Sequence, residues 1–147
     1  MAVYDKGINY ITGMNFIAAG ALLVSDGLEV EAFQLIRYFY SSKYGLKLRE
    51  FYMKDSPRLN FYVYSVSYLL EERFFPIYSH LQEKGITKVS DFVFQFLQSL
   101  YMRTFDFEIG VRLWDCLISF GPDFLIKFTI GFFQKIENEN FIFGFVS

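Results

Sequence analysis

The stretch FEIGVRLWDCLIS, residues 107–119, decides the fold class of this chain. Its apolar side chains recur at spacings of three or four residues, as on one face of an α-helix: Ile109, Leu113, Trp114, Leu117 and Ile118. Its polar side chains recur at spacings of four, three and four residues: Glu108, Arg112, Asp115 and Ser119. Because the two sets occupy different faces, the sequence predicts an amphipathic helix with its apolar face buried.

The same helical period continues on both sides of this stretch. Residues 13–24 are apolar on nearly all faces, which is typical of a helix buried in the middle of an α-domain. In residues 28–40 we expect an amphipathic helix whose apolar face is formed by Val30, Phe33, Ile36 and either Tyr40 or Phe39. No segment alternates like a strand between hairpin turns. We therefore expect an all-α fold of about six to seven helices without a sheet, in one domain over residues 1–147 with no linker. The remaining helices are predicted over residues 58–74, 76–84, 92–102 and 123–138.

Residues 41–57 do not follow the helical period. They mix glycine, proline and charged residues with Leu46, Leu48 and Phe51. We expect a long connection that these three apolar side chains anchor to the core.

Composition and charge exclude several classes of function. The 14 Lys and Arg against 16 Asp and Glu give a net charge of -2 with no basic block, so nucleic acid is not an expected partner. One cysteine, Cys116, and one histidine, His80, cannot form an internal disulfide or a zinc site, and we expect no metal and no cofactor. Aromatic residues make up 22% of the chain, so we expect some rings to contact a surface outside it.

Targeting signals are not evident either. Residues 1–9 contain Asp5 and no apolar run of signal-peptide length, and the uncharged run from Ile8 to Val24 is shorter than the ~20 residues needed to cross a bilayer. We therefore expect a cytoplasmic protein with no membrane span.

Side-chain chemistry alone points to no enzyme class. Cys116 lies beside Trp114 and Leu117 without a histidine nearby, and the adjacent carboxylates Glu71 and Glu72 are expected to be solvated. No glycine pattern matches a P-loop or a dinucleotide-binding fingerprint.

The order of short motifs carries more information. Residues 10–15, Tyr-Ile-Thr-Gly-Met-Asn, are followed by Glu-Ala-Phe at 31–33, Arg-Leu-Trp-Asp at 112–115 and Gly-Pro at 121–122. This series resembles the Y-x-Q-G-M-N, E-A-F, R-I-W-D and G-P motifs of the TBC family, the all-helical Rab GTPase-activating proteins. The resemblance covers nearly the whole chain but only the second half of a TBC domain. The positions of this chain that correspond to the family motifs are Tyr10, Thr12, Gly13, Met14, Asn15, Arg112, Trp114 and Asp115.

The resemblance also implies how such a domain works, and which parts are missing here. The family stimulates GTP hydrolysis with an arginine from a motif in its first half and with the glutamine of Y-x-Q. In this chain the first arginine is Arg37, and Thr12 occupies the glutamine position, where its hydroxyl is too short to act as the amide does. We therefore assign no catalytic residue and expect a pseudoenzyme without GTPase-activating activity.

These observations leave three hypotheses about the function. The first is a degenerate TBC-like domain that binds a small GTPase or serves as a scaffold subunit in a larger assembly. The second is part of an active Rab GTPase-activating protein whose arginine lies on another chain or is missing. The third is an unrelated helical, membrane-associated subunit.

The interpretation of the chain as the second half of a TBC domain also predicts partners. Other protein chains should complete or cover it, with a Rab-type GTPase as a further partner, because two apolar faces should lie open. These are residues 13–24 and the face of the last helix formed by Phe124, Phe128, Phe132 and Phe133. Thr12 is expected to be the N-cap of the first helix, or close to it.

Overall fold

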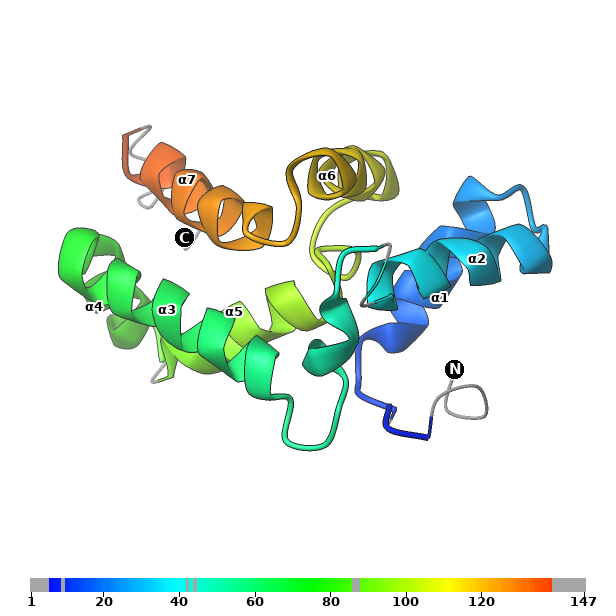
Figure 1. Ribbon diagram of the computed structural model, residues 1–147. Coiled ribbons are helices and arrows are strands. Elements are labelled where there is room, and N and C mark those ends of the chain that lie inside the picture. The colour runs from blue at the N-terminus through cyan, green and yellow to red at the C-terminus, as the bar shows by residue number, and fades with distance from the viewer. Residues whose placement is uncertain (1–5, 9, 42, 44, 86–87, 139–147) are drawn as a thin grey trace.

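The computed structural model describes residues 6–8, 10–41, 43, 45–85 and 88–138, and this part of the chain is helical (Figure 1). It contains no strand beyond one isolated antiparallel bridge between Ile8 and Met53. The predicted all-α fold is confirmed. The elements are α1 (Met14–Val24), α2 (Glu29–Tyr40), the 3₁₀ helix η1 (Leu48–Phe51), α3 (Pro57–Arg73), α4 (Phe75–Glu83), α5 (Val89–Gln98), α6 (Phe107–Phe120) and α7 (Phe124–Asn138).

The longest helix, α3, organises one end of the molecule. It packs against α5, α7, α4 and η1, whereas α1 and α2 pack on each other at the opposite end (Figure 1). Helix α6 contacts both α7 and α1 and so joins the two ends. None of the helices in the described ranges is long and apolar enough to cross a membrane.

The long connection between α2 and α3 is anchored as predicted. Leu46, Leu48 and Phe51 are all buried, and η1 forms around the last two. Gly45 is required at its start, because a Cβ there would lie 1.7 Å from the carbonyl oxygen of Tyr38. The connection is therefore a packed part of the core.

Helix α5 differs from its prediction at both ends. It begins at Val89 and ends at Gln98, instead of running over 92–102. The early end follows from Leu100 and Tyr101, which both adopt left-handed backbone angles, with φ of 48° and 68°. Left-handed non-glycine residues cost about 1 to 2 kcal/mol each, so the surrounding contacts must hold this turn in place.

The exposed faces differ in part from those expected. Val30 is 70% exposed and Phe33 37%, whereas the C-terminal members of the predicted face, Phe39 and Tyr40, are buried together with Ala32. Periodicity identifies an apolar face but does not show whether another element covers it. For the same reason two members of the predicted apolar face of α6, Ile109 and Ile118, are exposed although Leu113, Trp114 and Leu117 are buried.

The two faces expected to be open also differ from each other. Helix α1 is not buried throughout, since Leu22, Leu23 and Val24 are exposed at its C-terminal end. On α7, in contrast, Phe133 is buried, and its neighbours on the helix are half-buried in an aromatic ladder with Phe120. The ladder consists of stacked rings four residues apart: Phe120, Phe124, Phe128 and Phe132.

Candidate functional site

The segment before α1 is held at two points, Ile8 and Gly13, and Tyr10 and Thr12 between them are exposed. Ile8 is 2% exposed and bridges Met53, which ties the chain to the end of η1. Gly13 has a φ of 108°, and a Cβ on it would lie 3.1 Å from Cγ of Gln98, so only glycine fits this close approach without strain. Between these anchors Tyr10 is 71% exposed and Thr12 is exposed as well.

Side chains of the motif fix the turn into α1. The amide N–H of Gly13 donates to Oδ1 of Asn15 over 3.2 Å, and the N–H of Ile11 donates to Sδ of Met14 over 3.3 Å. The N–H of Met14 in turn donates to the carbonyl of Ile11. Gly13 is the N-cap of α1, so Thr12 lies one residue before the cap and not at it. We call residues 10–12 the α1 entry turn.

A buried polar layer lies beneath Gly13. The hydroxyl of Tyr52 donates to the carbonyl of Gln98 over 2.9 Å, and the ring of Tyr40 meets that of Tyr52 edge-on at 4.8 Å. Burial raises the pKa of both Tyr40 and Tyr52 well above the usual range, so both hydroxyls remain protonated at neutral pH. The polar layer beneath Gly13 is therefore uncharged at neutral pH.

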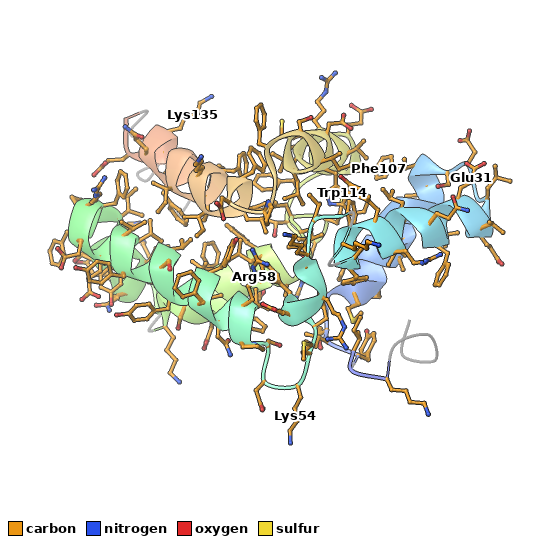
Figure 2. All side chains as sticks on the ribbon, viewed as in Figure 1. Glu31, Lys54, Arg58, Phe107, Trp114 and Lys135 are labelled. Carbon is orange, nitrogen blue, oxygen red and sulfur yellow. The ribbon has the colours of Figure 1, made fainter. Side chains whose placement is uncertain are left out.

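The second motif, on α6, serves the core. Trp114 is 3% exposed, its Nε1–H donates to the carbonyl of Leu100 over 3.1 Å, and its ring meets Phe39 edge-on at 4.9 Å. It lies between α6 and the α1–α2 pair (Figure 2). Arg112 and Asp115, on either side of it in the sequence, are exposed.

The structure does not bring the two motifs together. Trp114 reaches α1 at Gly20, where a Cβ would lie 3.0 Å from Cη2 of the indole. Gly20 is seven residues beyond Gly13, or about 10 Å along the helix. The entry turn and the α6 motif are thus separate features, and the entry turn is the candidate functional site.

One polar cluster was not anticipated from the sequence. The hydroxyl of Tyr62 donates to Oδ1 of Asp123 over 2.9 Å, and the guanidinium of Arg58 lies 5.7 Å from the centre of the Tyr62 ring. Arg58 also donates from Nη1 to the carbonyl of Lys47 over 3.2 Å. The cluster joins α3 to the start of α7 and to the connection, and no local signal could reveal a contact between residues 61 positions apart.

Among the residues that the structure describes, no group of three or more metal-ligating side chains comes together. Cys116 is a half-buried free thiol on α6, and His80 is half-buried on α4. Both residues lie on helices far along the chain from the entry turn.

Comparison with known proteins identifies the family. The family model for the Rab-GTPase-TBC domain matches residues 1–141. The chain is similar to the GTPase-activating protein GYP5 of Saccharomyces cerevisiae, with 32% identity over 92% of this chain and 15% of that protein. It is also similar to the Rab GTPase-activating protein eat-17 of Caenorhabditis elegans, with 26% identity over 94% of this chain and 15% of that protein. No solved structure matches the chain significantly.

These relatives overturn the expectation of a protein without GTPase-activating function. Several are named GTPase-activating proteins, and nothing marks this chain as a pseudoenzyme. The expectation failed because it treated the lack of an arginine motif in 147 residues as a property of a whole protein, whereas the chain spans only about 15% of the length of these relatives. By its family match and its all-helical fold, the chain belongs to the Rab-GTPase-TBC domain family.

Proposed function

We propose that the chain forms part of a GTPase-activating domain that acts on a Rab-type GTPase, and that the α1 entry turn contacts the GTPase. The names of the relatives support the activity. The position of the contact is supported by one observation: Tyr10 and Thr12 are exposed on a segment whose two ends are anchored to the core.

Rigid presentation suits this role. Activation of GTP hydrolysis depends on groups held in position beside the phosphates, and misplacement by about 1 Å can cost a hundredfold in rate. The hydrogen bonds within residues 11–15 and the close fit of Gly13 on Gln98 hold the entry turn in one geometry. The 71% exposed ring of Tyr10 offers the kind of aromatic anchor that dominates protein interfaces.

The chemistry is divided between this chain and other groups. Arginine spreads positive charge over the transferring phosphoryl group and is worth about 10³ to 10⁵ in rate. We propose that this arginine comes from polypeptide outside the 147 residues. The Thr12 hydroxyl sits on the β-carbon, so we assign the orientation of the attacking water to a glutamine of the GTPase itself.

The exposed apolar end of the α1–α2 pair fits the same proposal. Leu23, Val24, Leu28 and Val30 are between 45% and 70% exposed, and clustered exposed apolar side chains mark surfaces that contact other polypeptide. We propose that further polypeptide of the GTPase-activating assembly covers this end. A cytoplasmic location belongs to the same proposal, and the free thiol of Cys116 suits a reducing compartment.

Phosphate release from a panel of GTP-loaded Rab GTPases tests the function. The full-length protein that carries this sequence should accelerate hydrolysis by about 10³ or more with at least one GTPase. Tyr10→Ala should lower kcat/KM about tenfold. Phe75→Ala removes a similarly exposed ring, 62% against 71%, from α4 and should leave it unchanged. No stimulation of any GTPase, or equal losses in the two variants, would contradict the proposal.

A further inference from the structure

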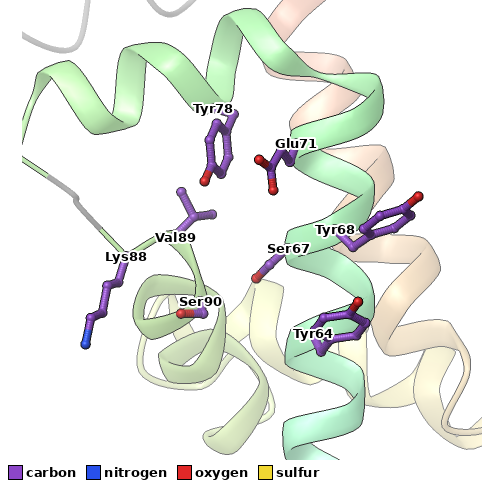
Figure 3. Close-up of a pocket in the computed structure, with 8 residues that line it drawn as sticks. All are labelled: Tyr64, Ser67, Tyr68, Glu71, Tyr78, Lys88, Val89 and Ser90. Atoms are coloured by element: carbon purple, nitrogen blue, oxygen red, sulfur yellow. The ribbon is translucent and has the colours of Figure 1, made fainter.

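A cavity of about 350 Å³ lies between α3, α4 and the start of α5, away from the entry turn (Figure 3). Helix α3 contributes Tyr64, Ser67, Tyr68 and Glu71, helix α4 contributes Tyr78, and α5 contributes Val89. Lys88 and Ser90 complete the lining, so three of its eight residues are tyrosines.

The hydroxyl of Ser67 is the first sign that the cavity accepts a polar group. Its Oγ atom is buried and has no hydrogen-bond partner among the described residues. Three other serines donate to the carbonyl four residues earlier: Ser65 on the same helix, Ser99 just after α5 and Ser119 on α6. A buried hydroxyl without a partner costs about 1 to 3 kcal/mol, and a donor entering the cavity would remove that penalty.

The charge inside the cavity is negative. Figure 3 shows the carboxylate of Glu71 directed from α3 toward the side on which Tyr78 lies, whereas the hydroxyl of Tyr78 points toward Val89. The side chain of Lys88, at the edge of the cavity, extends away from that space. Glu71 therefore offers an acceptor and a counter-charge, with Lys88 directed elsewhere.

The tyrosine rings complete a surface that suits a cation. Tyr64 and Tyr68 stack at 6.3 Å with an angle of 19° between their planes, and both are more than half exposed at the rim. The face of an aromatic ring attracts ammonium and guanidinium groups by about 0.5 to 2 kcal/mol. Ring faces, a carboxylate and an unpaired hydroxyl are the elements with which proteins hold organic cations.

We propose that this cavity, bounded by Ser67, Glu71 and Tyr78, is a binding site for a guanidinium or alkylammonium group. The carboxylate of Glu71 pairs with the cation, Ser67 accepts one of its hydrogen bonds, and the tyrosines cover its apolar part. The site is independent of the proposed GTPase contact, because no residue is common to the two.

Two-dimensional NMR of the chain titrated with Nα-acetyl-arginine amide tests the proposal. Saturable shifts should be confined to the amides of residues that line the cavity. Nα-acetyl-lysine amide should bind at the same place, whereas the neutral Nα-acetyl-glutamine amide should not. A capped Gly-Gly-Arg-Gly-Gly peptide separates the sources of the cation: at least tenfold tighter binding than the single residue indicates an arginine within a polypeptide, and equal binding indicates a free cation.

Neighbouring glutamates provide a matched control. Glu71→Gln keeps the shape of the side chain and should weaken binding about tenfold, whereas Glu72→Gln makes the same change at an exposed residue outside the cavity and should have no effect. Ser67→Ala should weaken binding about threefold. Thermal unfolding verifies that each variant is folded, and Glu71 is exposed, so we expect no loss of fold. The proposal fails if neither cation gives saturable shifts, if the neutral amide binds as well, or if the two glutamate variants behave alike.

Discussion

The indole N–H of Trp114 donates a hydrogen bond to the carbonyl of Leu100 over 3.1 Å. Leu100 is the first of two consecutive left-handed residues, and the hydroxyl of the second, Tyr101, donates to the carbonyl of Leu125 over 2.7 Å. The strained turn after α5 is thus held from α6 on one side and from α7 on the other. Trp114 of the R-L-W-D motif therefore has a structural role in the core, apart from the candidate site.

Replacement of Trp114 by phenylalanine tests that role. Trp114→Phe keeps an aromatic ring but leaves the carbonyl of Leu100 without its donor, and it should lower the free energy of unfolding by about 1 to 3 kcal/mol. Phe107→Leu on the same helix alters a side chain that is 41% exposed. This control should change the free energy of unfolding by less than about 0.5 kcal/mol. Urea denaturation measures both. Equal effects would show that the turn does not depend on the indole.

Two glycines in helices should respond in opposite ways to alanine. A Cβ on Gly20 would displace the flexible end of Met102 and would lie 3.0 Å from the buried ring of Trp114, which has no room to move, so Gly20→Ala should destabilise the chain by about 1 to 3 kcal/mol. Gly131 in α7 has no atom within 4 Å of such a Cβ, so Gly131→Ala should stabilise it by about 0.5 to 1 kcal/mol. Thermal unfolding curves compare the two. A neutral Gly20→Ala would contradict the close contact of α1 with α6.

The buried tyrosines make stability sensitive to alkaline pH. Burial raises the pKa of Tyr101 above its usual value of 10.0, although its hydrogen bond to Thr129 partly lowers it. The folded chain therefore keeps this proton where the unfolded chain loses it, and the resulting stability is complete below about pH 10 and falls as pH rises above it. We expect a loss approaching 1.4 kcal/mol per pH unit for each such tyrosine.

Urea denaturation between pH 8 and pH 11 measures this slope. Tyr101→Phe should make the decline above pH 10 less steep, because it removes one of the groups responsible. At pH 8 the same variant should be less stable than the wild type, because Thr129 and Leu125 lose a hydrogen-bond partner. A decline as steep in the variant as in the wild type would show that Tyr101 does not contribute to it.

Thr12 should be replaceable without loss of stability. It is exposed and precedes the N-cap Gly13, so Thr12→Gln should change the free energy of unfolding by less than about 0.5 kcal/mol. Because the proposed function assigns the attacking water to a glutamine of the GTPase, the longer amide has no vacant role there. In the full-length protein the rate of GTP hydrolysis should therefore stay close to that of the wild type for both Thr12→Gln and Thr12→Ala. A stability loss above 1 kcal/mol would show that the threonine has a structural role.

The fold was largely predictable because its helices are strongly periodic. Helix α6 was expected over 107–119 and spans Phe107–Phe120, and α7 was expected over 123–138 and spans Phe124–Asn138. The end of α5 was not predictable, because left-handed angles at Leu100 and Tyr101 depend on contacts from α6 and α7 and have no local signal. The exposure of Val30 was missed because periodicity does not reveal which apolar face is covered.

The candidate site was predictable only in part. Sequence motifs located residues 10–15 and 112–115, but they could not show that the first group forms an exposed, anchored turn and that Trp114 in the second is buried. The cavity between α3, α4 and α5 is lined by eight residues between Tyr64 and Ser90, and no spacing in the sequence indicates it.

Photo-crosslinking tests the central claim, that the entry turn faces the GTPase, most directly. Benzoylphenylalanine would replace Tyr10 in the full-length protein, or Phe75 as a ring of similar exposure on α4. Each protein would be irradiated with the responsive Rab GTPase loaded with GDP and aluminium fluoride, which mimics the transferring phosphoryl group. We predict a cross-link to the GTPase from position 10 and none from position 75. Cross-linking from position 75 alone would contradict the account.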